Sequence, residues 1–207
     1  YFLGDDGVHG CRLWRSDGTS AGTFMINAFY PSGPIESIKP LGRQGDTCYF
    51  SVVGVVPGLD NGVWRTNGLT AERIQAITAL SSAIMMENVL YFGGLGGLCR
   101  VDSPTAAPIP LGGGTGDGYI SDFIIFDSKL FFWSVGGLWR TDGTVEGTVP
   151  VKAVDKPRWK VVSGNTLYFW AGDHLWKSDG TGPGTVAIED ACTPSGTVIA
   201  PDPHILG

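Results

Sequence analysis

Short apolar runs alternate with clusters of glycine, aspartate, serine and threonine along the whole chain, without a helical stretch. One phrase recurs five times: an apolar residue, an aromatic residue in four of the five copies, a basic residue and a polar turn. Its copies begin at Leu13, Val63, Leu98, Leu138 and Leu175. A period of about forty residues that carries strands and turns but no helix is typical of a β-propeller.

Each repeat contains the same four predicted strands. A variable apolar strand precedes an aromatic strand such as Leu90-Tyr91-Phe92, and the Leu-Trp-Arg strand follows. A Ser-Asp-Gly-Thr turn then leads to a strand that opens with Gly-Thr, and Asp-Gly is a strong hairpin signal. The pattern predicts four-stranded antiparallel blades. Blades two to five are expected at 35–78, 80–111, 117–154 and 157–190.

The first blade is expected to be completed by the other end of the chain. The sequence starts in an aromatic strand, Tyr1-Phe2, so this blade lacks its first strand. An apolar segment within residues 195–207 supplies one extra strand, which would join residues 1–28. We therefore predict a single all-β domain over 1–207, a five-bladed β-propeller closed in a 3+1 arrangement. Such closure hides sheet edges that would otherwise promote aggregation.

The four cysteines fit this closure. Cys11 opens the Leu-Trp-Arg strand of the first blade, and Cys192 precedes the predicted closing strand. Adjacent antiparallel strands place the start of one beside the end of the next, so the two cysteines should meet at one rim. We predict a Cys11–Cys192 disulfide. Cys48 and Cys99 sit at apolar positions in neighbouring blades, where free buried thiols are expected.

Charge and composition restrict the environment and the partners. The 207 residues carry a formal net charge of −6, and no cluster of lysine or arginine is present. This argues against binding to nucleic acid or to anionic membrane surfaces. No apolar run is long enough to span a bilayer. Few lysines, many tryptophans and glycine-rich turns favour an extracellular, cell-surface or periplasmic location.

The repeats also carry a family resemblance. Asp5 to Gly10, followed by Leu-Trp-Arg-Ser-Asp-Gly-Thr and Ala21-Gly22-Thr23, resembles the "ELWKSDGT" repeats of secreted and cell-surface bacterial proteins. The third repeat departs from that pattern, because Cys99 replaces the tryptophan and Ser103-Pro104 replaces Gly-Thr. The resemblance implies a β-propeller array. At the level of the fold, a five-bladed ring of this size is similar to tachylectin-2-type lectins, which bind amino sugars between blades.

Residues present in every repeat are expected to be structural. The basic residues after the tryptophan position are Arg15, Arg65, Arg100, Arg140 and Lys177. They could form five equivalent ligand sites, but we favour a role in holding each blade to its neighbour or capping a turn carbonyl. The repeated tryptophan offers a large apolar surface that suits packing between blades.

Residues that break the repeat are better candidates for a binding site. Trp133 and Trp170 follow the aromatic pair in the fourth and fifth repeats, and Trp159 and His174 lie in the same two repeats. Exposed indole rings stack on sugars and anchor protein interfaces. We predict that these four residues form the main binding surface. The alternative is that the tryptophans fill a wider gap in an irregular ring.

Signals for catalysis are weak. Propeller glycosidases need two or three carboxylates around the central channel, and only Glu36 and Asp122 fall within predicted inner strands. The histidines His9, His174 and His204 show no metal-ligand spacing. We expect neither an enzyme nor a bound metal or cofactor. The predicted function is binding or scaffolding that docks a protein partner or a larger assembly; the alternative is a lectin-like module with sugar sites between blades.

Overall fold

The computed structural model describes residues 1–8, 11–26, 35–54, 61–77, 80–94, 96–113 and 120–188, and every regular element in these ranges is a β-strand. Sheet 1 contains β1 (Phe2–Asp5), β2 (Cys11–Arg15) and β3 (Phe24–Met25). Sheet 2 contains β4 (Ile35–Gln44), β5 (Thr47–Gly54), β6 (Gly62–Thr66) and β7 (Ala71–Ala76).

The remaining strands form three further sheets. Sheet 3 contains β8 (Leu80–Met86), β9 (Val89–Gly94), β10 (Gly97–Val101) and β11 (Ile109–Gly112). Sheet 4 contains β12 (Ser121–Phe126), β13 (Lys129–Ser134), β14 (Gly137–Thr141) and β15 (Val149–Lys152). Sheet 5 contains β16 (Pro157–Ser163), β17 (Thr166–Ala171), β18 (His174–Ser178) and β19 (Val186–Ile188).

Every sheet is an antiparallel meander whose strands pair in sequence order, which confirms the predicted blades. Tight turns at the first hairpin of sheets 3 and 4 set this topology. Glu87-Asn88 and Asp127-Ser128 all take positive φ, between 49° and 64°. Two consecutive residues with positive φ make the turn whose twist matches paired antiparallel strands.

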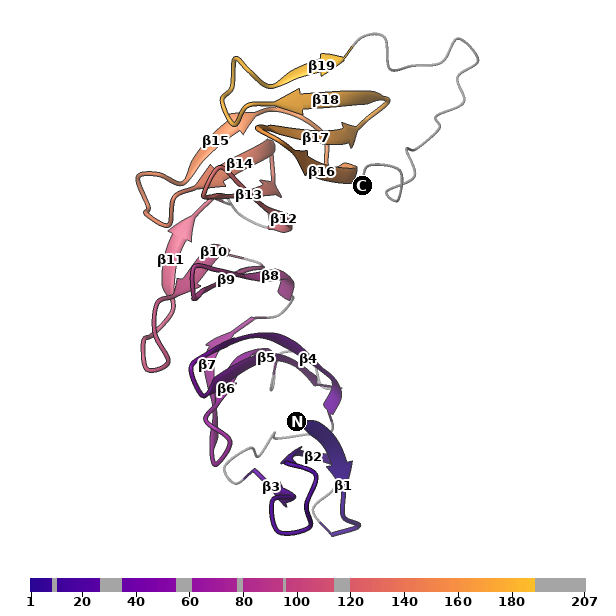
Figure 1. Cartoon of the computed structure of the whole chain (residues 1–207), viewed down its shortest axis with the longest axis vertical. Helices are drawn as coiled ribbons and strands as arrows, with labels where there is room; N and C mark the ends of the chain where they lie inside the picture. Colours follow the sequence, from indigo (N-terminus) through magenta and orange to yellow (C-terminus); the bar gives the residue numbers. More distant parts are fainter. Residues whose placement is uncertain are drawn as a thin grey trace.

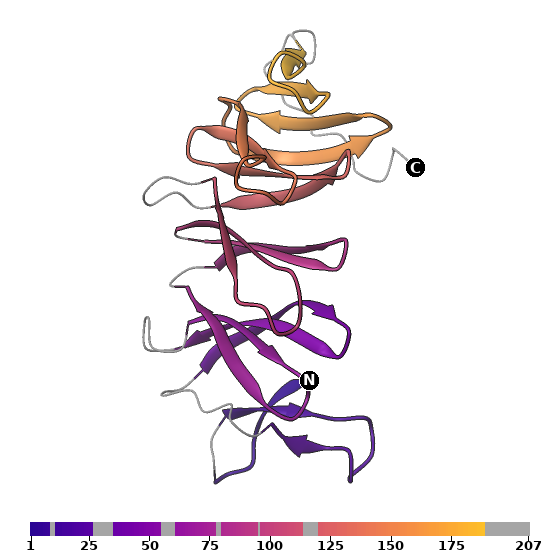
Figure 2. The same ribbon diagram turned by 90° about the vertical axis from the view of Figure 1, so that its left-hand side faces the viewer.

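The five sheets stack face to face in an open arc, in the order of the sequence (Figures 1 and 2). Sheet 1 and sheet 5 lie at opposite ends of this arc. The predicted ring closure is therefore absent from this conformation. Within the described residues sheet 1 has three strands, and the proposed closing segment, 195–207, lies outside those residues.

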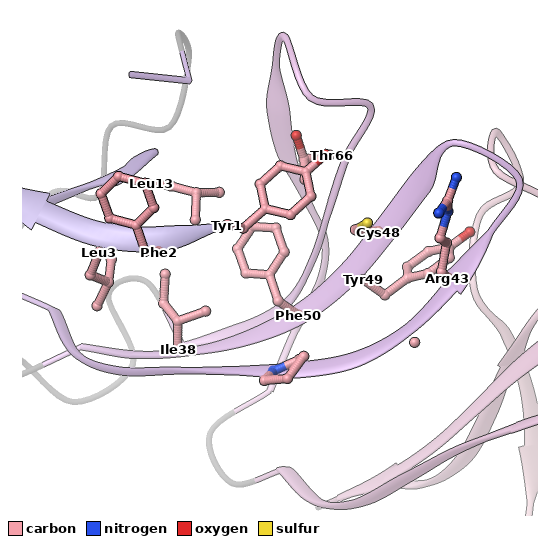
Figure 3. A pocket seen from close by; sticks show the side chains of 12 residues that line it. Tyr1, Phe2, Leu3, Leu13, Ile38, Arg43, Cys48, Tyr49, Phe50 and Thr66 are labelled. Atoms are coloured by element: carbon pink, nitrogen blue, oxygen red, sulfur yellow. The ribbon is translucent and has the colours of Figure 1, made fainter. Parts of the chain in front are cut away.

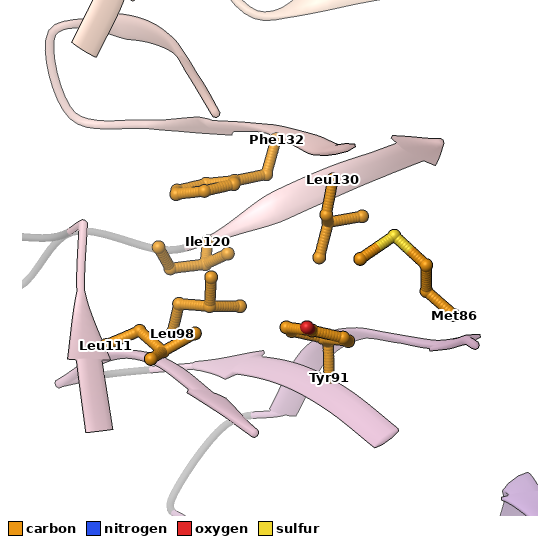
Figure 4. Close-up of a cluster of buried hydrophobic side chains, with 7 residues drawn as sticks. All are labelled: Met86, Tyr91, Leu98, Leu111, Ile120, Leu130 and Phe132. Carbon is orange, nitrogen blue, oxygen red and sulfur yellow. The ribbon is translucent and has the colours of Figure 1, made fainter. Parts of the chain in front are cut away.

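The core consists of apolar clusters between consecutive sheets. Figure 4 shows the cluster between sheets 3 and 4, where Leu98 and Tyr91 face Leu130, Ile120 and Phe132. The next residue along β13, Phe131, belongs instead to the cluster between sheets 4 and 5. Successive side chains of a strand point to opposite faces, so one aromatic strand supplies both neighbouring clusters.

The repeated tryptophan packs within these layers, as predicted. Its ring stacks on the second residue of the aromatic pair of the same sheet. Trp139 lies 6.3 Å from Phe132, and Trp176 lies 6.1 Å from Phe169, measured between ring centroids. The planes of the second pair are nearly parallel, at 5°. Each of these two stacks packs against the preceding sheet. The recurring sequence therefore produces a recurring interface between neighbouring sheets.

Truncation of one buried aliphatic residue should test this layered core. Leu130 is 0% exposed, so Leu130→Ala should lower the free energy of unfolding by about 2–5 kcal/mol through lost apolar burial and a residual cavity. Val145→Ala is the control, because Val145 is 57% exposed, and its change should stay within about 0.5 kcal/mol. Chemical denaturation measures both. Equal effects of the two variants would contradict the assignment of the core.

Candidate binding sites between the sheets

Sheets 2 to 5 each present an aromatic and a basic residue directly opposite one another on their two middle strands. Tyr91 pairs with Arg100 in sheet 3, and Phe131 pairs with Arg140 in sheet 4. We call such a cross-strand pair a junction pair. The other junction pairs are Tyr49 with Arg65 in sheet 2 and Tyr168 with Lys177 in sheet 5. Tyr1 and Arg15 continue the same register in sheet 1, where Phe2 pairs with Trp14.

The junction pair binds a glycine in the Ser/Thr-Asp-Gly turn of the next sheet. Arg140 Nη1 donates a hydrogen bond to the carbonyl oxygen of Gly180 at 2.8 Å. Arg100 Nη1 donates in the same way to the carbonyl of Gly143. A Cβ atom on Gly143 would lie only 2.7 Å from Tyr91 Oη, and its φ is +94°. Glycine is thus required by both the backbone conformation and the close approach.

The same arrangement joins sheets 1 and 2. A Cβ atom on Gly68 would lie 2.7 Å from Arg15 Nη1 and 3.1 Å from Tyr1 Oη. The junction between sheets 2 and 3 is a variant, because the third repeat lacks the turn glycine. There Arg65 Nη1 donates to the carbonyl of Ala106 at 2.8 Å. The structural role predicted for the basic residues is confirmed at these junctions.

In the Ser/Thr-Asp-Gly turns of sheets 1, 4 and 5, the aspartate holds the turn in shape. Asp142 Oδ1 accepts hydrogen bonds from the Thr144 amide at 2.9 Å and from its hydroxyl at 2.7 Å. These bonds lower the pKa of the Asp142 carboxyl. A Cβ atom on Gly147 would lie 2.0 Å from the same oxygen, which explains the glycine that opens the following strand. The repeated aspartates are therefore internal acceptors of their own turns.

The predicted exposure of Trp133 and Trp170 is wrong. Trp133 is 2% exposed and Trp170 is 6% exposed. Trp133 lies on the same face as Phe131 and makes an edge-to-face contact with Phe169 of sheet 5, with centroids 5.3 Å apart. Side chains alternate between the two faces of a strand, so Trp133 lies on the face of sheet 4 that packs against sheet 5. Its indole ring therefore fills that interface. This supports the packing alternative for Trp133.

The four predicted site residues do not form one surface. Trp133 contacts Phe169 on the face of sheet 5 that packs against sheet 4. Trp170 is the next residue in β17, so its side chain lies on the opposite face, beside its register partner Trp159. Trp159 is half-buried, whereas His174 is exposed. His174 instead borders a cavity of about 590 Å³ between sheets 4 and 5, together with residues such as Asp155. Their role in binding a partner stays a prediction.

This cavity between sheets 4 and 5 has polar walls. Ser134, Asp155, Lys156 and His174 line it, with Trp176 at one side. The Ser134 hydroxyl is buried and has no hydrogen-bond partner among the described residues. An unsatisfied buried hydroxyl beside a cavity is able to bind a polar ligand atom. The polar walls and the neighbouring indole give this cavity a mixed chemical character.

A second cavity of about 570 Å³ lies between sheets 1 and 2 and is mainly apolar (Figure 3). Its walls include Leu3, Leu13, Ile38 and Phe50. Burial raises the pKa of Tyr1, whose ring also lines it. Sequence reasoning missed this cavity, because it placed the Tyr1-Phe2 strand inside a completed blade. The only sequence signal was the position of that strand at the start of the chain.

Of the two candidate acids, Asp122 is paired with lysines. Lys156 Nζ and Lys160 Nζ each lie 3.2 Å from a carboxylate oxygen of Asp122. Burial raises the pKa of Asp122, but hydrogen bonds from Ser121 and Lys156 and the charge of Lys160 outweigh it and lower the pKa. The carboxylate is thus held ionised and unsuited to donate a proton. Glu36 lies in β4, and its side chain is outside the described part of the structure.

The predicted Cys11–Cys192 disulfide is wrong for this structure, because Cys11 carries a free thiol. Cys192 itself lies outside the described residues. The predicted disulfide depended on a first blade completed by the other end of the chain, and sheet 1 lies at the opposite end of the arc from sheet 5. Cys48 and Cys99 are free, as expected, and both are half-buried. Burial raises the pKa of the Cys99 thiol.

Two further searches concern metals and membranes. Among the described residues, no group of three or more His, Cys, Asp or Glu side chains is placed to hold a metal ion. His9 and His204 lie outside those residues. Within the same ranges, no helix has the length and apolar character needed to cross a bilayer.

Comparison with known proteins gives the fold. No family model and no curated protein matches the sequence. Apo AztD from Citrobacter koseri matches 84% of this chain with a TM-score of 0.56 at 14% identity. A second AztD structure from the same organism matches 80% with a TM-score of 0.55 at 13% identity. The fold is that of a β-propeller. Identities this low carry the fold alone.

The similar structures are longer than this chain. The matched part is 51% and 48% of the two AztD chains, so this chain spans about half of their length. The extracellular domain of the putative one-component system BT4673 from B. thetaiotaomicron matches 87% of this chain at 14% identity, with a TM-score of 0.52. Only 27% of that domain is covered.

Loss of one junction hydrogen bond should destabilise the stack. Arg140→Met should lower the free energy of unfolding by about 1.5–3 kcal/mol, because the buried Gly180 carbonyl loses a charged donor. Arg158→Met is the control, since Arg158 is exposed in β16, and its effect should stay within about 0.5 kcal/mol. Urea titration provides the values. Indistinguishable variants would refute the role of the junction.

The turn aspartates should make stability depend on acid pH. Hydrogen bonds lower the pKa of Asp142 and Asp179 below the unfolded value of 3.8. Their stabilising contribution is therefore present above that value and is lost as the pH falls through the folded-state pKa. Asp142→Asn with Asp179→Asn should flatten the decline in melting temperature between about pH 5 and pH 2.

Asparagine is the right replacement for this test, because the second repeat already uses it. Asn67 Oδ1 accepts hydrogen bonds from the amides of Leu69 at 2.9 Å and Thr70 at 3.0 Å, so the turn survives without a charge. An unchanged slope of melting temperature against pH in the double variant would show that these carboxylates do not link folding to protons.

Proposed function

We propose that this chain is a non-catalytic binding or scaffolding β-propeller of a secreted or cell-surface bacterial protein, and that it docks a protein partner. The location rests on the composition and on the resemblance to secreted bacterial repeats. The similarity to an extracellular domain agrees with it. The docking role is supported by an exposed aromatic stack on sheet 1.

One observation carries the docking role: the aromatic stack that the inner sheets bury is partly exposed on sheet 1. Phe2 stacks on Trp14 with centroids 6.3 Å apart and planes 20° apart. The corresponding stack of Phe132 on Trp139 is 6.3 Å and 21°, and it packs against sheet 3. Phe2 is 45% exposed, whereas its counterpart Phe132 is buried. Exposed apolar faces of this kind mark interaction sites.

A catalytic role is not proposed. The repeated charged residues are used by the junctions and turns, as Arg140 and Asp142 illustrate. Asp122, one of the two acids considered for glycoside hydrolysis, is neutralised by Lys156 and Lys160. Without a raised pKa it lacks the property that a general acid requires.

A lectin-like role is the second candidate, and the polar cavity between sheets 4 and 5 favours it. Sugar sites combine hydrogen-bonding groups with an aromatic ring that contacts the apolar face of the sugar. Ser134, Asp155 and His174 provide polar groups there, and Trp176 provides the ring. This site would lie between two blades, as the lectin alternative requires.

Docking should depend on the aromatic end of the arc. The chain should form a complex of defined stoichiometry that survives gel filtration with light scattering. Phe2→Ser should weaken the complex, because it removes the exposed ring from the docking face. Val145→Ser, at another exposed apolar position, should leave it unchanged.

The same chain on a glycan array separates the two candidates. Binding that a free monosaccharide competes away, and that His174→Ala but not Phe2→Ser abolishes, would replace the docking role with the lectin role. Absence of glycan binding together with a Phe2-dependent protein complex supports docking.

A further inference from the structure

The cavity between sheets 4 and 5 contains polar groups that no neighbouring side chain uses. Its volume is about 590 Å³, and all the residues that line it lie in the continuously described range 120–188. Its walls come from the end of β13, the link between β15 and β16, and the β17–β18 hairpin (Figure 1). Gly136, Asp155 and His174 of the lining are exposed, so the cavity opens to solvent.

The Asp155 carboxylate carries an unpaired charge in this cavity. Among the described residues, it makes neither a hydrogen bond nor an ion pair. Its Oδ2 atom lies 3.4 Å from the position of a Cβ atom on Gly172, so it reaches from the link to the β17–β18 turn. The link also packs closely on sheet 4. A Cβ atom on Gly137 would overlap the carbonyl of Lys152 and lie 2.7 Å from the Val154 amide nitrogen. Both sheets therefore fix the position of the carboxylate.

Lys156, the lysine of the lining, is paired with a different carboxylate. Its Nζ lies 3.2 Å from Asp122 Oδ2, and Lys160 Nζ lies 3.2 Å from Asp122 Oδ1. Asp122 itself does not line the cavity. Lys156 therefore does not neutralise Asp155, although the two residues are adjacent in the sequence. The cavity keeps a carboxylate that is able to pair with a ligand.

A hydroxyl and an aromatic ring accompany this carboxylate. The Ser134 hydroxyl is buried and has no hydrogen-bond partner among the described residues, which is rare for a buried polar group. Trp176 donates its indole N–H to the Ala171 carbonyl at 3.3 Å and stacks on Phe169 with planes 5° apart. These contacts hold the ring in place and use its donor. Trp176 thus contributes its π system to the cavity.

A carboxylate, a hydroxyl acceptor and an indole ring together suit a cationic ligand. A charged donor binds a carboxylate more strongly than a neutral donor does. A guanidinium also stacks on tryptophan, and it has enough N–H donors to reach both Asp155 and Ser134. The net charge of −6 attracts cations from a distance. A neutral sugar would use the ring and the hydroxyl but not the charge.

We propose that this cavity binds the side chain of an arginine on a partner protein. The guanidinium pairs with Asp155, donates to Ser134 and lies against the ring of Trp176. The cavity has the size of a small-molecule site, so it also admits residues that flank the arginine. The inference goes beyond the docking role of sheet 1, because it assigns a second contact and the chemistry that the contact recognises.

NMR titration of the isotope-labelled chain tests the inference. The probe is the blocked tripeptide acetyl-Gly-Arg-Gly-amide. The matched control peptide carries citrulline, which has nearly the same shape without the charge. The arginine peptide should shift the backbone amide signals of Gly136, Gly172 and His174 and the indole N–H signal of Trp176. The citrulline peptide should bind at least about threefold more weakly, because it cannot form the ion pair with Asp155.

Three variants of the chain test the sign of the charge. Asp155→Asn keeps the size of the side chain and should weaken binding of the arginine peptide at least about threefold. Glu146→Gln is the matched control, because it removes a charge from another exposed loop of sheet 4 and should leave binding unchanged. Lys156→Gln should tighten binding, since it removes a positive charge beside the cavity. Opposite responses of Asp155→Asn and Lys156→Gln would indicate an anionic ligand and overturn the inference.

Free ethylguanidine distinguishes a small molecule from a protein side chain as the source of the cation. The blocked arginine peptide should bind at least as tightly as ethylguanidine, because the cavity also admits the flanking residues. Binding of ethylguanidine without binding of the peptide would assign the cavity to a small guanidine and overturn the proposed partner.

Three further results would also overturn the inference. They are the absence of any shift with the arginine peptide, equal binding of the arginine and citrulline peptides, and an Asp155→Asn variant that binds like the wild type. Shifts of the same amides by N-acetylglucosamine alone would assign the cavity to the lectin role. In each case, a Phe2-dependent protein complex would leave the docking role of sheet 1 intact. Arginine binding without such a complex would remove only that role.

Discussion

The hydrogen bond from a basic side chain to a backbone carbonyl of the next sheet is the interaction on which this stack depends. It fixes the other features of the repeat. The turn needs a glycine because only that residue presents its carbonyl at positive φ under an aromatic ring, as Gly143 does under Tyr91. The turn needs a side-chain oxygen as acceptor: Asp142 holds its turn through Thr144, and Asn67 does the same in the second repeat. One directional contact thus explains most of the recurring phrase.

Apolar burial and this contact have different roles. The clusters between sheets supply most of the favourable energy, but apolar contact is not directional. A guanidinium offers several donors in a rigid plane and keeps its charge when half-buried. It can therefore fix the position of one sheet on the next. Arg65 shows that the requirement is for a carbonyl rather than for glycine, because it reaches Ala106 where the third repeat has lost the turn.

Much of the fold could be predicted from the sequence. The strands, the antiparallel blades, the packing of the repeated tryptophan and the structural role of residues such as Arg140 follow from periodicity and repetition. Ring closure could not be predicted, since it depends on the small angles that accumulate between sheets, which no single residue determines. The Cys11 disulfide failed with it.

The candidate site was harder to predict, for a local reason. Trp133 broke the repeat and suggested function, but its position alternates onto the face between blades, where it packs on Phe169. Trp133 lies two residues after Phe131 in β13, so the two side chains lie on the same face of the sheet. The cavities depend on which sheets are neighbours, and this is known only from the arrangement in space.

The central claim is that each junction couples two neighbouring sheets, and hydrogen exchange read by mass spectrometry tests it most directly. In Arg140→Met, the backbone amides of sheet 5 should lose protection relative to the wild type, because that sheet is released from the Gly180 contact. Sheets 1 to 3 should keep their protection, since each contacts only its neighbours. Uniform loss across all sheets, or no change in sheet 5, would contradict the account.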